Sequence, residues 1–520
     1  MTRSSRLALA LVPAAFGVVM VAWPLAAIFR RGLAPEGTLT LEPLGAVFAS
    51  DRTRSLVRFT IGQAVASTLL TLVVGIPAAW ALSRTWRGAG LARAIVTVPF
   101  VLPTVVVGLA FRHWLDRGTL AIVLAHAVFN VAVVVRVVGA AWAGLDPEVD
   151  EAARVLGATP SRAFLTTTLP RLRAAIAGAA LVTFMFSFTS FGVITVLGGP
   201  RTGTIETEIA RVARQLQFDR AAALTLVQLV VVAAVLALAA RLGTVRGIDR
   251  FDPSPRRGRP VLLAAALTPA LVLVVTPLTM LADRVARPHG SWSTAGIASL
   301  AADDTALAIR PLDSLFVSLR FALVATAVAG VVGGLAAIAV RDRRRGLGRL
   351  LEFLLVVPLG VSAVTIGYGY LVTFDEPPLE LRAHWYIVPL AHAAVAVPFV
   401  VRATVPALRA VDPALREVAA TLGARPLRVW FDVDRPLAAR AFAAGVGFAA
   451  AISLGEFGAT SLLAREGTPS APFAIGRLLG RPGERNQQAA FALALVLGCV
   501  TALVVFVADA LGRPRREVRA

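Results

Sequence analysis

The chain has 520 residues, of which 57% are hydrophobic and 16% are charged, and its mean hydropathy is +0.75. This composition excludes a soluble globular protein and is typical of a protein that crosses a membrane many times. The net charge of +21 would fit a nucleic-acid-binding protein, but the basic residues are dispersed between apolar stretches and therefore indicate membrane topology. We expect no nucleic-acid partner.

About twelve apolar stretches follow one another, each long enough to cross a membrane as a helix, which needs roughly 20 residues. We therefore predict an all-α polytopic membrane protein. Arg3 and Arg6 precede the first stretch, as in a signal peptide, but its apolar run of about 23 residues exceeds the roughly 7–15 of a signal-peptide core and predicts a span. The stretches lie near 7–29, 57–82, 92–111, 119–142, 172–197, 220–241, 260–282, 314–340, 349–372, 385–410, 438–462 and 488–511.

The arginines predict the orientation of the spans, because cytoplasmic loops carry an excess of basic residues. Every basic residue is an arginine, and with the N-terminus inside, one side receives about 29 of them in its loops and the other side about 18. The richer side should be cytoplasmic. This predicts a multi-pass protein of the cell (inner or plasma) membrane with both termini in the cytoplasm. The segments on this side are 1–6, 84–93, 144–174, 241–260, 341–349, 412–440 and 513–520.

The second half of the chain repeats the first. The clearest matches are Glu151 with Glu417, Gly157 with Gly423 and Pro170 with Pro436, at a constant offset of 266 (417−151, 423−157, 436−170). Earlier matches have an offset of 259: Gly75 with Gly334, Pro99 with Pro358 and Gly108 with Gly367. Six spans in each half give a parallel repeat, related by an axis along the membrane normal. We predict a first half at 1–245, a cytoplasmic linker at 246–259 and a second half at 260–520.

A polar loop on the cytoplasmic side occurs in both halves, at 145–170 and 411–436. In the first copy Asp146 can cap a helix that begins at Pro147, and Gly157 ends that helix, because glycine takes a left-handed backbone at little cost. Thr159 and Pro160 can start a second short helix, and Pro170 begins the next span. The second copy repeats these signals at Asp412-Pro413, Gly423, Arg425-Pro426 and Pro436.

The first short helix presents a narrow apolar face made largely of small side chains, Val149, Ala152, Ala153 and Leu156. An amphipathic helix lying on the membrane surface is one interpretation. Such a helix would favour Leu, Phe or Trp, so the alanines indicate a closely packed protein partner instead.

The two loops resemble the EAA loop of ABC importer permeases. Glu151, Ala152, Ala153, Gly157 and Pro170 match the motif nearly completely, whereas Glu417, Ala419, Ala420, Gly423 and Pro436 match it more loosely. Val418 displaces the alanines of the second copy, and Arg435 replaces the apolar residue before its proline. The resemblance covers essentially the whole chain and implies a type I importer permease fold.

The resemblance also implies what the chain lacks. In the family this loop is the coupling helix, which sits in a cleft of an ATP-hydrolysing subunit. A phosphate-binding loop of the GxxxxGK[ST] type needs a lysine, and the sequence has none, so ATP and Mg²⁺ belong to a separate subunit, which we expect in two copies. We predict that the chain is not an enzyme, holds no cofactor and has no catalytic residue. One cysteine, Cys499, and five dispersed histidines predict no metal site.

Polar residues in the span after each loop are candidates for the translocation path. These are Ser187, Thr189, Ser190, Ser453 and Glu456. An acid at membrane depth is a candidate functional residue, so Glu456 either attracts a cation in the path or pairs with a buried arginine, Arg136 or Arg402. The serines either line the path or only ease helix packing, and packing is the favoured interpretation.

Segments 198–222 and 465–490 should face the outside, where they either receive a solute-binding protein loaded with substrate or lie flat as interfacial helices. Ile205, Ile209, Val212 and Leu216 give the first an amphipathic pattern. The combination of LGGP, TIE, SFTSFG and GEFG looks like the fused permeases for thiamine and for ferric iron, and is closer to the thiamine permeases. A secondary transporter is a less favoured alternative, because it needs no pair of glycine-broken cytoplasmic loops.

Overall fold

The computed structural model describes residues 3–34, 37–199, 202–242, 258–341, 346–375, 377–465 and 467–512. The described residues contain helices and no β-strand. The predicted linker at 246–259 lies outside the described residues except for 258 and 259.

The helices of the first half run from α1 to α13 along the chain. Their bounds are α1 (Arg3–Gly17), η1 (Val18–Ala22), α2 (Trp23–Leu33), α3 (Glu42–Ala49), α4 (Asp51–Leu82), α5 (Ala89–Thr97), η2 (Val98–Phe100), α6 (Thr104–Trp114), α7 (Thr119–Ala143), α8 (Pro147–Val155), α9 (Pro160–Ala163), η3 (Phe164–Thr168), α10 (Leu169–Phe188), α11 (Gly192–Leu197), α12 (Ile205–Arg214) and α13 (Phe218–Arg241).

The helices of the second half repeat this order from α14 onward. Their bounds are α14 (Pro260–Ala286), α15 (Ala295–Ala298), η4 (Ser299–Ala301), α16 (Pro311–Val340), α17 (Leu347–Val356), η5 (Val357–Leu359), α18 (Ala363–Thr373), α19 (Ile387–Arg409), α20 (Pro413–Thr421), α21 (Pro426–Val429), η6 (Trp430–Asp434), α22 (Arg435–Gly455), α23 (Thr460–Leu463), α24 (Ala471–Leu479) and α25 (Glu484–Gly512).

Ten helices in the described residues are long and apolar enough to cross a membrane, and two bent pairs raise the number to twelve. Each of the twelve predicted stretches corresponds to one of these helices or bent pairs, and the stretches near 92–111 and 349–372 are the two bent pairs. The chain bends by 100° between η2 and α6 and by 107° between η5 and α18. Pro99 and Pro358 lie just before the two bends, where a missing N–H and a fixed φ interrupt the helical hydrogen bonds.

The spans after the two polar loops also end earlier than predicted. Helix α10 stops at Phe188 and α22 at Gly455, and short helices α11 and α23 follow after three or four residues of non-helical chain. At their other ends the two spans begin earlier than predicted. The short helices α9 and α21 continue through the single π-helical turns η3 and η6 into α10 and α22. Pro170 and Pro436, which were expected to begin these spans, therefore lie inside continuous helical segments.

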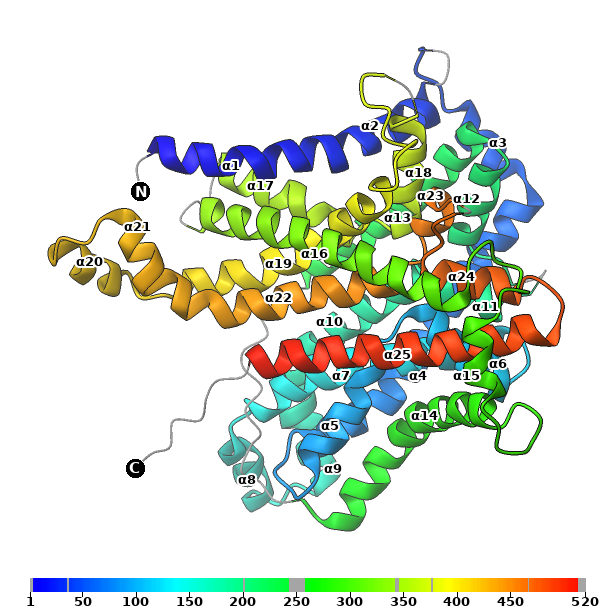
Figure 1. Ribbon diagram of the computed structural model, residues 1–520. Helices are drawn as coiled ribbons and strands as arrows, with labels where there is room; N and C mark the ends of the chain where they lie inside the picture. The colour runs from blue at the N-terminus through cyan, green and yellow to red at the C-terminus, as the bar shows by residue number, and fades with distance from the viewer. Residues whose placement is uncertain are drawn as a thin grey trace.

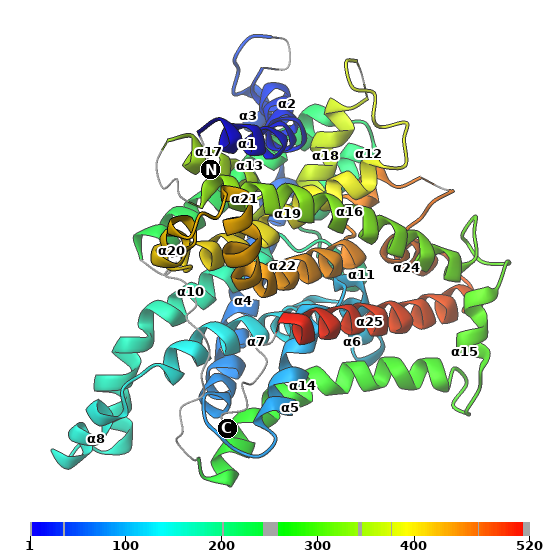
Figure 2. The same ribbon diagram turned by 60° about the vertical axis from the view of Figure 1, so that its left-hand side comes forward.

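The first helix of each half packs against the other half. Helix α1 runs along α16 and α17, and α2 packs on α18, whereas α14 packs on α4, α5, α6 and α7. Figure 1 shows α1 along one edge of the bundle and α14 along the opposite edge, and the turned view in Figure 2 agrees. Each sequence half therefore holds the other in place, and a hydrophobic core with members from both halves runs through the bundle.

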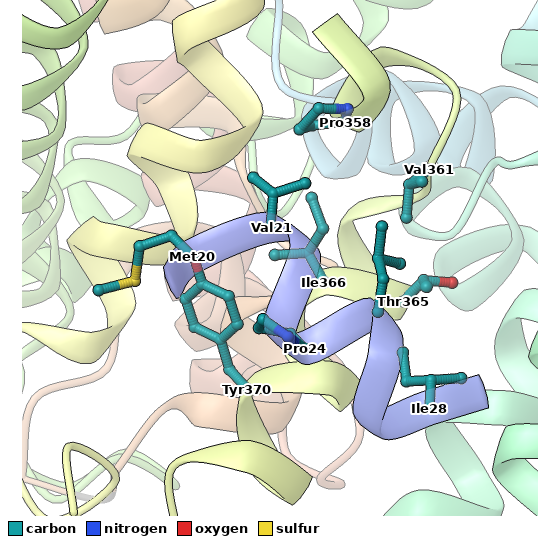
Figure 3. A pocket seen from close by; sticks show the side chains of 10 residues that line it. Met20, Val21, Pro24, Ile28, Pro358, Val361, Thr365, Ile366 and Tyr370 are labelled. Carbon is teal, nitrogen blue, oxygen red and sulfur yellow. The ribbon is translucent and has the colours of Figure 1, made fainter. Parts of the chain in front are cut away.

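A small apolar pocket lies where α2 meets α18 in this exchanged contact (Figure 3). Pro24 and Ile28 line it from α2, and Thr365, Ile366 and Tyr370 line it from α18. The pocket therefore lies between a helix of the first half and a bent pair of the second half.

Two matched glycines let the short helices approach the broken spans. A Cβ at Gly367 in α18 would lie 2.7 Å from the Cα of Ala459, just before α23. A Cβ at Gly108, its counterpart in α6, would lie 3.1 Å from the Cβ of Val196 in α11. The close approach to backbone at Gly367 cannot be relieved by rotating a side chain.

We therefore expect Gly367→Ala to lower the stability of the detergent-solubilised protein by about 1–3 kcal/mol, the usual cost of overpacking, and Gly108→Ala to cost less. Gly62→Ala in α4 is the control, because a Cβ at Gly62 would meet no atom within 4 Å. Thermal unfolding would measure the difference. An unchanged melting temperature for Gly367→Ala would contradict the close packing of α18 on the α23 segment.

Candidate functional site

The two polar loops project at one end of the molecule. Helices α8 and α20 lie apart from one another at this end in both views, and α1 begins there and α25 ends there (Figures 1 and 2). Both loops have the predicted helix, glycine turn and second helix. The side chains of Asp146 and Asp412 each accept a hydrogen bond from a backbone N–H at 2.9 Å, and Gly157 and Gly423 have φ of +85° and +81°.

The loop residues that we expected to contact a partner are accessible. Ala153 and Ala419 are half-buried, and the others are exposed: Glu151, Ala152, Gly157, Pro170, Glu417, Ala420, Gly423 and Pro436. No residue of α8 or α20 is buried. The apolar side chains Val155, Leu156 and Leu422 are 82–88% exposed, so each loop presents apolar surface that nothing in the described chain covers.

The second loop is tied to the bundle by an ion network that the sequence did not reveal. Asp434, in η6, is 1% exposed and accepts hydrogen bonds from Arg341, at the end of α16, and from Arg416 of α20 at 2.7 Å. Arg416 also donates to the carbonyl of Leu408 at 3.0 Å. One buried carboxylate therefore connects the loop helix, the following span and α16.

The first loop has no acid at the position equivalent to Asp434. The repeat places Thr168 opposite Asp434 and Asp150 opposite Arg416, since both differences (434−168 and 416−150) are 266. Asp150 makes a 3.4 Å ion pair with Arg154 on its own helix, and Trp142 stacks on Phe164 with ring centroids 5.9 Å apart. The two loops are thus held differently. The sequence comparison found a difference between them, but in Val418 and Arg435 rather than in the anchor.

The two halves meet at the short breaks after α10 and α22. Phe191 and Phe457, which are equivalent in the repeat, contact one another with ring centroids 5.1 Å apart. Because equivalent residues of two related halves meet only near the axis that relates them, this contact marks the axis.

The serines proposed for the path are buried in helix contacts in this conformation. Ser187 is fully buried, and its hydroxyl lies 3.4 Å from the Asn130 side chain of α7. Ser453 lies 2.8 Å from Nδ1 of His392 in α19. Ser190 is 8% exposed, and Thr189 donates to the carbonyl of Met185 at 2.9 Å.

Glu456 occupies the break after α22 and is 7% exposed. Its Oε1 accepts from the backbone N–H groups of Gly458 (2.9 Å) and Ala459 (3.3 Å), and its Oε2 accepts from that of Thr460 (3.2 Å). The proposed partners Arg136 and Arg402 are both exposed, and Arg136 lies over the ring of Phe448. Backbone N–H groups at the start of α23 therefore hold this carboxylate. Of the two alternatives that the sequence left open, pairing with Arg136 or Arg402 is wrong, and a place in the translocation path stays a prediction.

A second buried acid, Glu206 of α12, was missed in the sequence. It is fully buried, and its Oε1 accepts from Nε2 of Gln228 at 2.8 Å. Burial raises the pKa of this carboxyl to about 7, and the nearby charge of Glu456 acts in the same direction, whereas Ser362 and Gln228 oppose the shift. Its position between Ile205 and Ile209, on the buried side of an amphipathic helix, was the available signal.

Helix α12 itself is not the exposed helix that the sequence suggested. Ile205, Ile209 and Val212 are at most 1% exposed, and only Leu216, beyond the end of α12, is largely exposed. The three apolar side chains of the helix therefore pack into the core. Docking of a solute-binding protein on segments 198–222 and 465–490 stays a prediction.

The chain is similar to known membrane transport proteins. The sequence model of the family described as "Binding-protein-dependent transport system inner membrane component" matches residues 71–287 and again 329–514. The thiamine transport system permease protein ThiP of Brucella suis is 27% identical over 512 residues, covering 89% of this chain and 88% of its own. The molybdenum transport system permease protein ModB of Mycobacterium tuberculosis is 31% identical over 46% of this chain and 95% of its own. The putrescine transport system permease protein PotI of Escherichia coli is 32% identical over 31% of this chain and 62% of its own.

The Asp434 network generates a prediction for the second loop. Asp434→Asn removes the charge that Arg341 and Arg416 share, and breaking such a buried pair should cost about 3 kcal/mol and loosen α20. Thermal unfolding and protease sensitivity at 411–436 would measure the two effects.

Asp432→Asn is the matched control, because Asp432 pairs with Arg428 at an exposed position where an ion pair contributes little. Equal behaviour of the two variants would show that the network does not anchor the loop.

Proposed function

The chain belongs to the family of binding-protein-dependent transport system inner membrane components, and we propose that it carries thiamine or its phosphates across the membrane as the permease of an ATP-driven importer. The observation that supports this substrate most strongly is the similarity to a thiamine permease along nearly the whole chain, with both halves fused as here. The molybdenum and putrescine permeases match shorter parts of the chain, 46% and 31% of it.

The permease is one part of a larger machine. ATP is hydrolysed by a separate subunit, and a solute-binding protein delivers the substrate. Two copies of the ATPase would dock on the cytoplasmic side, one on the loop around Glu151 and Gly157 and one on the loop around Glu417 and Gly423. The matched geometry of α8 and α20 supports two docking sites, and their exposed apolar side chains supply surface to bury there.

The orientation follows from this assignment. ATP is hydrolysed in the cytoplasm, so the end of the molecule that carries α8 and α20 would be cytoplasmic, together with the beginning of α1 and the end of α25. The arginine distribution independently supports this orientation. Closure of the ATPase subunits would move α8 and α20 and, with them, the adjoining short helices α9 and α21. These short helices continue through η3 and η6 into the spans α10 and α22, which end at the contact between the halves.

The first prediction concerns the ligand. The cognate binding protein should bind thiamine or a thiamine phosphate in a calorimetric screen that also includes ferric complexes, molybdate and putrescine. The loaded protein should then raise ATP hydrolysis by the complete transporter in proteoliposomes above the rate seen with the unloaded protein. Binding of one of the other ligands without thiamine would contradict the proposed substrate and leave the importer assignment intact.

The second prediction concerns docking. Charge reversal in Glu151→Arg/Glu417→Arg should weaken ATPase binding, because a desolvated charge at an interface becomes repulsive at a cost of about 2–5 kcal/mol, or roughly thirty-fold or more in Kd. Glu42→Arg is the control, since Glu42 is exposed on α3, away from the loops. Co-purification of the ATPase with the double variant at the normal level would contradict the docking assignment.

A further inference from the structure

Two buried acids form no ion pair with an arginine side chain in the part of the chain that the structure describes. Glu206 is fully buried and Glu456 is 7% exposed, and in the described chain no arginine forms an ion pair with either. Oε2 of Glu206 has no hydrogen-bond partner there. The nearest basic group to Glu456 is Nε2 of His392 at 3.7 Å, and that nitrogen lies 2.8 Å from the Thr460 hydroxyl. Burying such groups without full compensation costs free energy.

The two acids come from opposite halves and lie close together. Glu206 belongs to α12, which packs against α18 and α23 of the second half, and Glu456 caps the start of the α23 segment. The Ser362 hydroxyl, at the start of α18, lies beside Glu206 and donates to Thr365 at 3.0 Å. The cluster therefore bridges the halves, and movement of α12 relative to α23 would open it.

The fold does not require these acids, because the equivalent positions on the other side of the axis between the halves hold no acid. Ile205 N–H donates to the Thr60 hydroxyl at 3.0 Å, and Ala471 N–H donates to the Ser318 hydroxyl at 2.7 Å, so α12 and α24 are equivalent at the offset of 266 (471−205). That offset places Pro472 opposite Glu206 and Ser190 opposite Glu456. Helix α11 starts after its break without any side-chain cap.

Aromatic rings lie next to the cluster. Phe457 follows Glu456 directly and contacts Phe191 at the axis between the halves. Carboxylates together with aromatic faces suit an organic cation, which gains from both. Among the described residues no group of three or more His, Cys, Asp or Glu side chains is arranged to hold a metal ion, which argues against a metal cation.

We propose that Glu206 and Glu456 form a recognition site for an organic cation on one side of the axis between the halves. In this conformation the site is closed by the contact between α12 and α23 and by the ring pair Phe191–Phe457. The proposal rests on the proposed function only in requiring that the chain translocates a solute. It gives the substrate class at the site, an organic cation, of which the thiazolium of thiamine is an example. Glu206 and Glu456 are then specificity-determining residues for transport.

The test compares charged and neutral cargo in the complete transporter, reconstituted with its ATPase and binding protein. The cargoes are thiamine and a neutral analogue in which carbon replaces the thiazolium nitrogen. Glu206→Gln and Glu456→Gln keep the size and most hydrogen bonds of the side chains. Each should lower the ratio of kcat/KM for thiamine to that for the analogue by roughly tenfold, the loss of one favourable ionic contact.

Glu208→Gln is the matched control, because it removes the same charge from the same helix. Glu208 instead pairs with Arg52 and Arg211. Loss of a merely structural acid would reduce uptake of both cargoes alike and leave the ratio at the wild-type value, as we expect for Glu208→Gln. An unchanged ratio in both Glu206→Gln and Glu456→Gln would overturn the proposal.

Failure of the thiamine assignment can be distinguished from failure of the proposed cation site. If the binding protein selects putrescine instead of thiamine, the thiamine assignment fails, and the same variants are measured with putrescine against its neutral diol analogue, where the same tenfold loss would support the site. If it selects molybdate, both proposals fail, because two buried carboxylates would repel an oxyanion.

Discussion

Every backbone N–H and C=O group at membrane depth needs a partner inside the protein, and this chain interrupts four of its spans. The interruptions lie between η2 and α6, between η5 and α18, after α10 and after α22. Side chains replace part of the lost hydrogen bonding. Ser362 accepts from the N–H of Thr365 at 3.0 Å, and the carboxylate of Glu456 accepts from three successive N–H groups. The places where the backbone is broken are therefore also the places where polar side chains gather, and there the two halves touch.

This constraint connects the two ends of the molecule. The loop helices α8 and α20 adjoin the short helices α9 and α21, which continue through π-helical turns into α10 and α22, and these spans end at the breaks beside Phe191 and Phe457. A long helix transmits displacement along its axis, whereas a break allows the two segments to rotate relative to one another. A displacement of a loop would then be transmitted to the contact between the halves, and bending of the span would absorb little of it. The anchor at Asp434 makes this transmission different in the two halves, because a buried carboxylate ties α20 to a third helix, α16, and the equivalent position before α10 is Thr168.

Much of the fold could be predicted from the sequence, since its signals are local. Apolar length located the spans, and Asp146, Gly157, Asp412 and Gly423 located the loop helices through capping and left-handed turns. The bends at Pro99 and Pro358 were not predicted, because a proline inside an apolar run is compatible with either a kink or a break. Of the two alternatives for Glu456, pairing with an arginine was wrong for a related reason. Hydropathy identifies a buried acid but not whether a side chain or the backbone satisfies it. Glu206 and Asp434 were missed because their importance comes from contacts with residues more than 20 positions away, Gln228 and Arg341.

Fusion of the two halves into one chain gives a physical reason for the differences between them. Two identical subunits would place an acid at the equivalents of both Glu206 and Glu456 on each side of the axis, and hence four acids around one path. Here Pro472 and Ser190 occupy the second set of positions, so the charge lies on one side. A small organic cation has no two-fold symmetry and presents its charge in one direction, so a second pair of buried acids would add desolvation cost without a matching contact. The exchanged packing of α1 and α14 keeps the two halves together while their interiors diverge. Under the proposed function, duplication would supply a symmetric frame with two ATPase docking sites, and divergence within the frame would supply the asymmetry that a single substrate molecule needs.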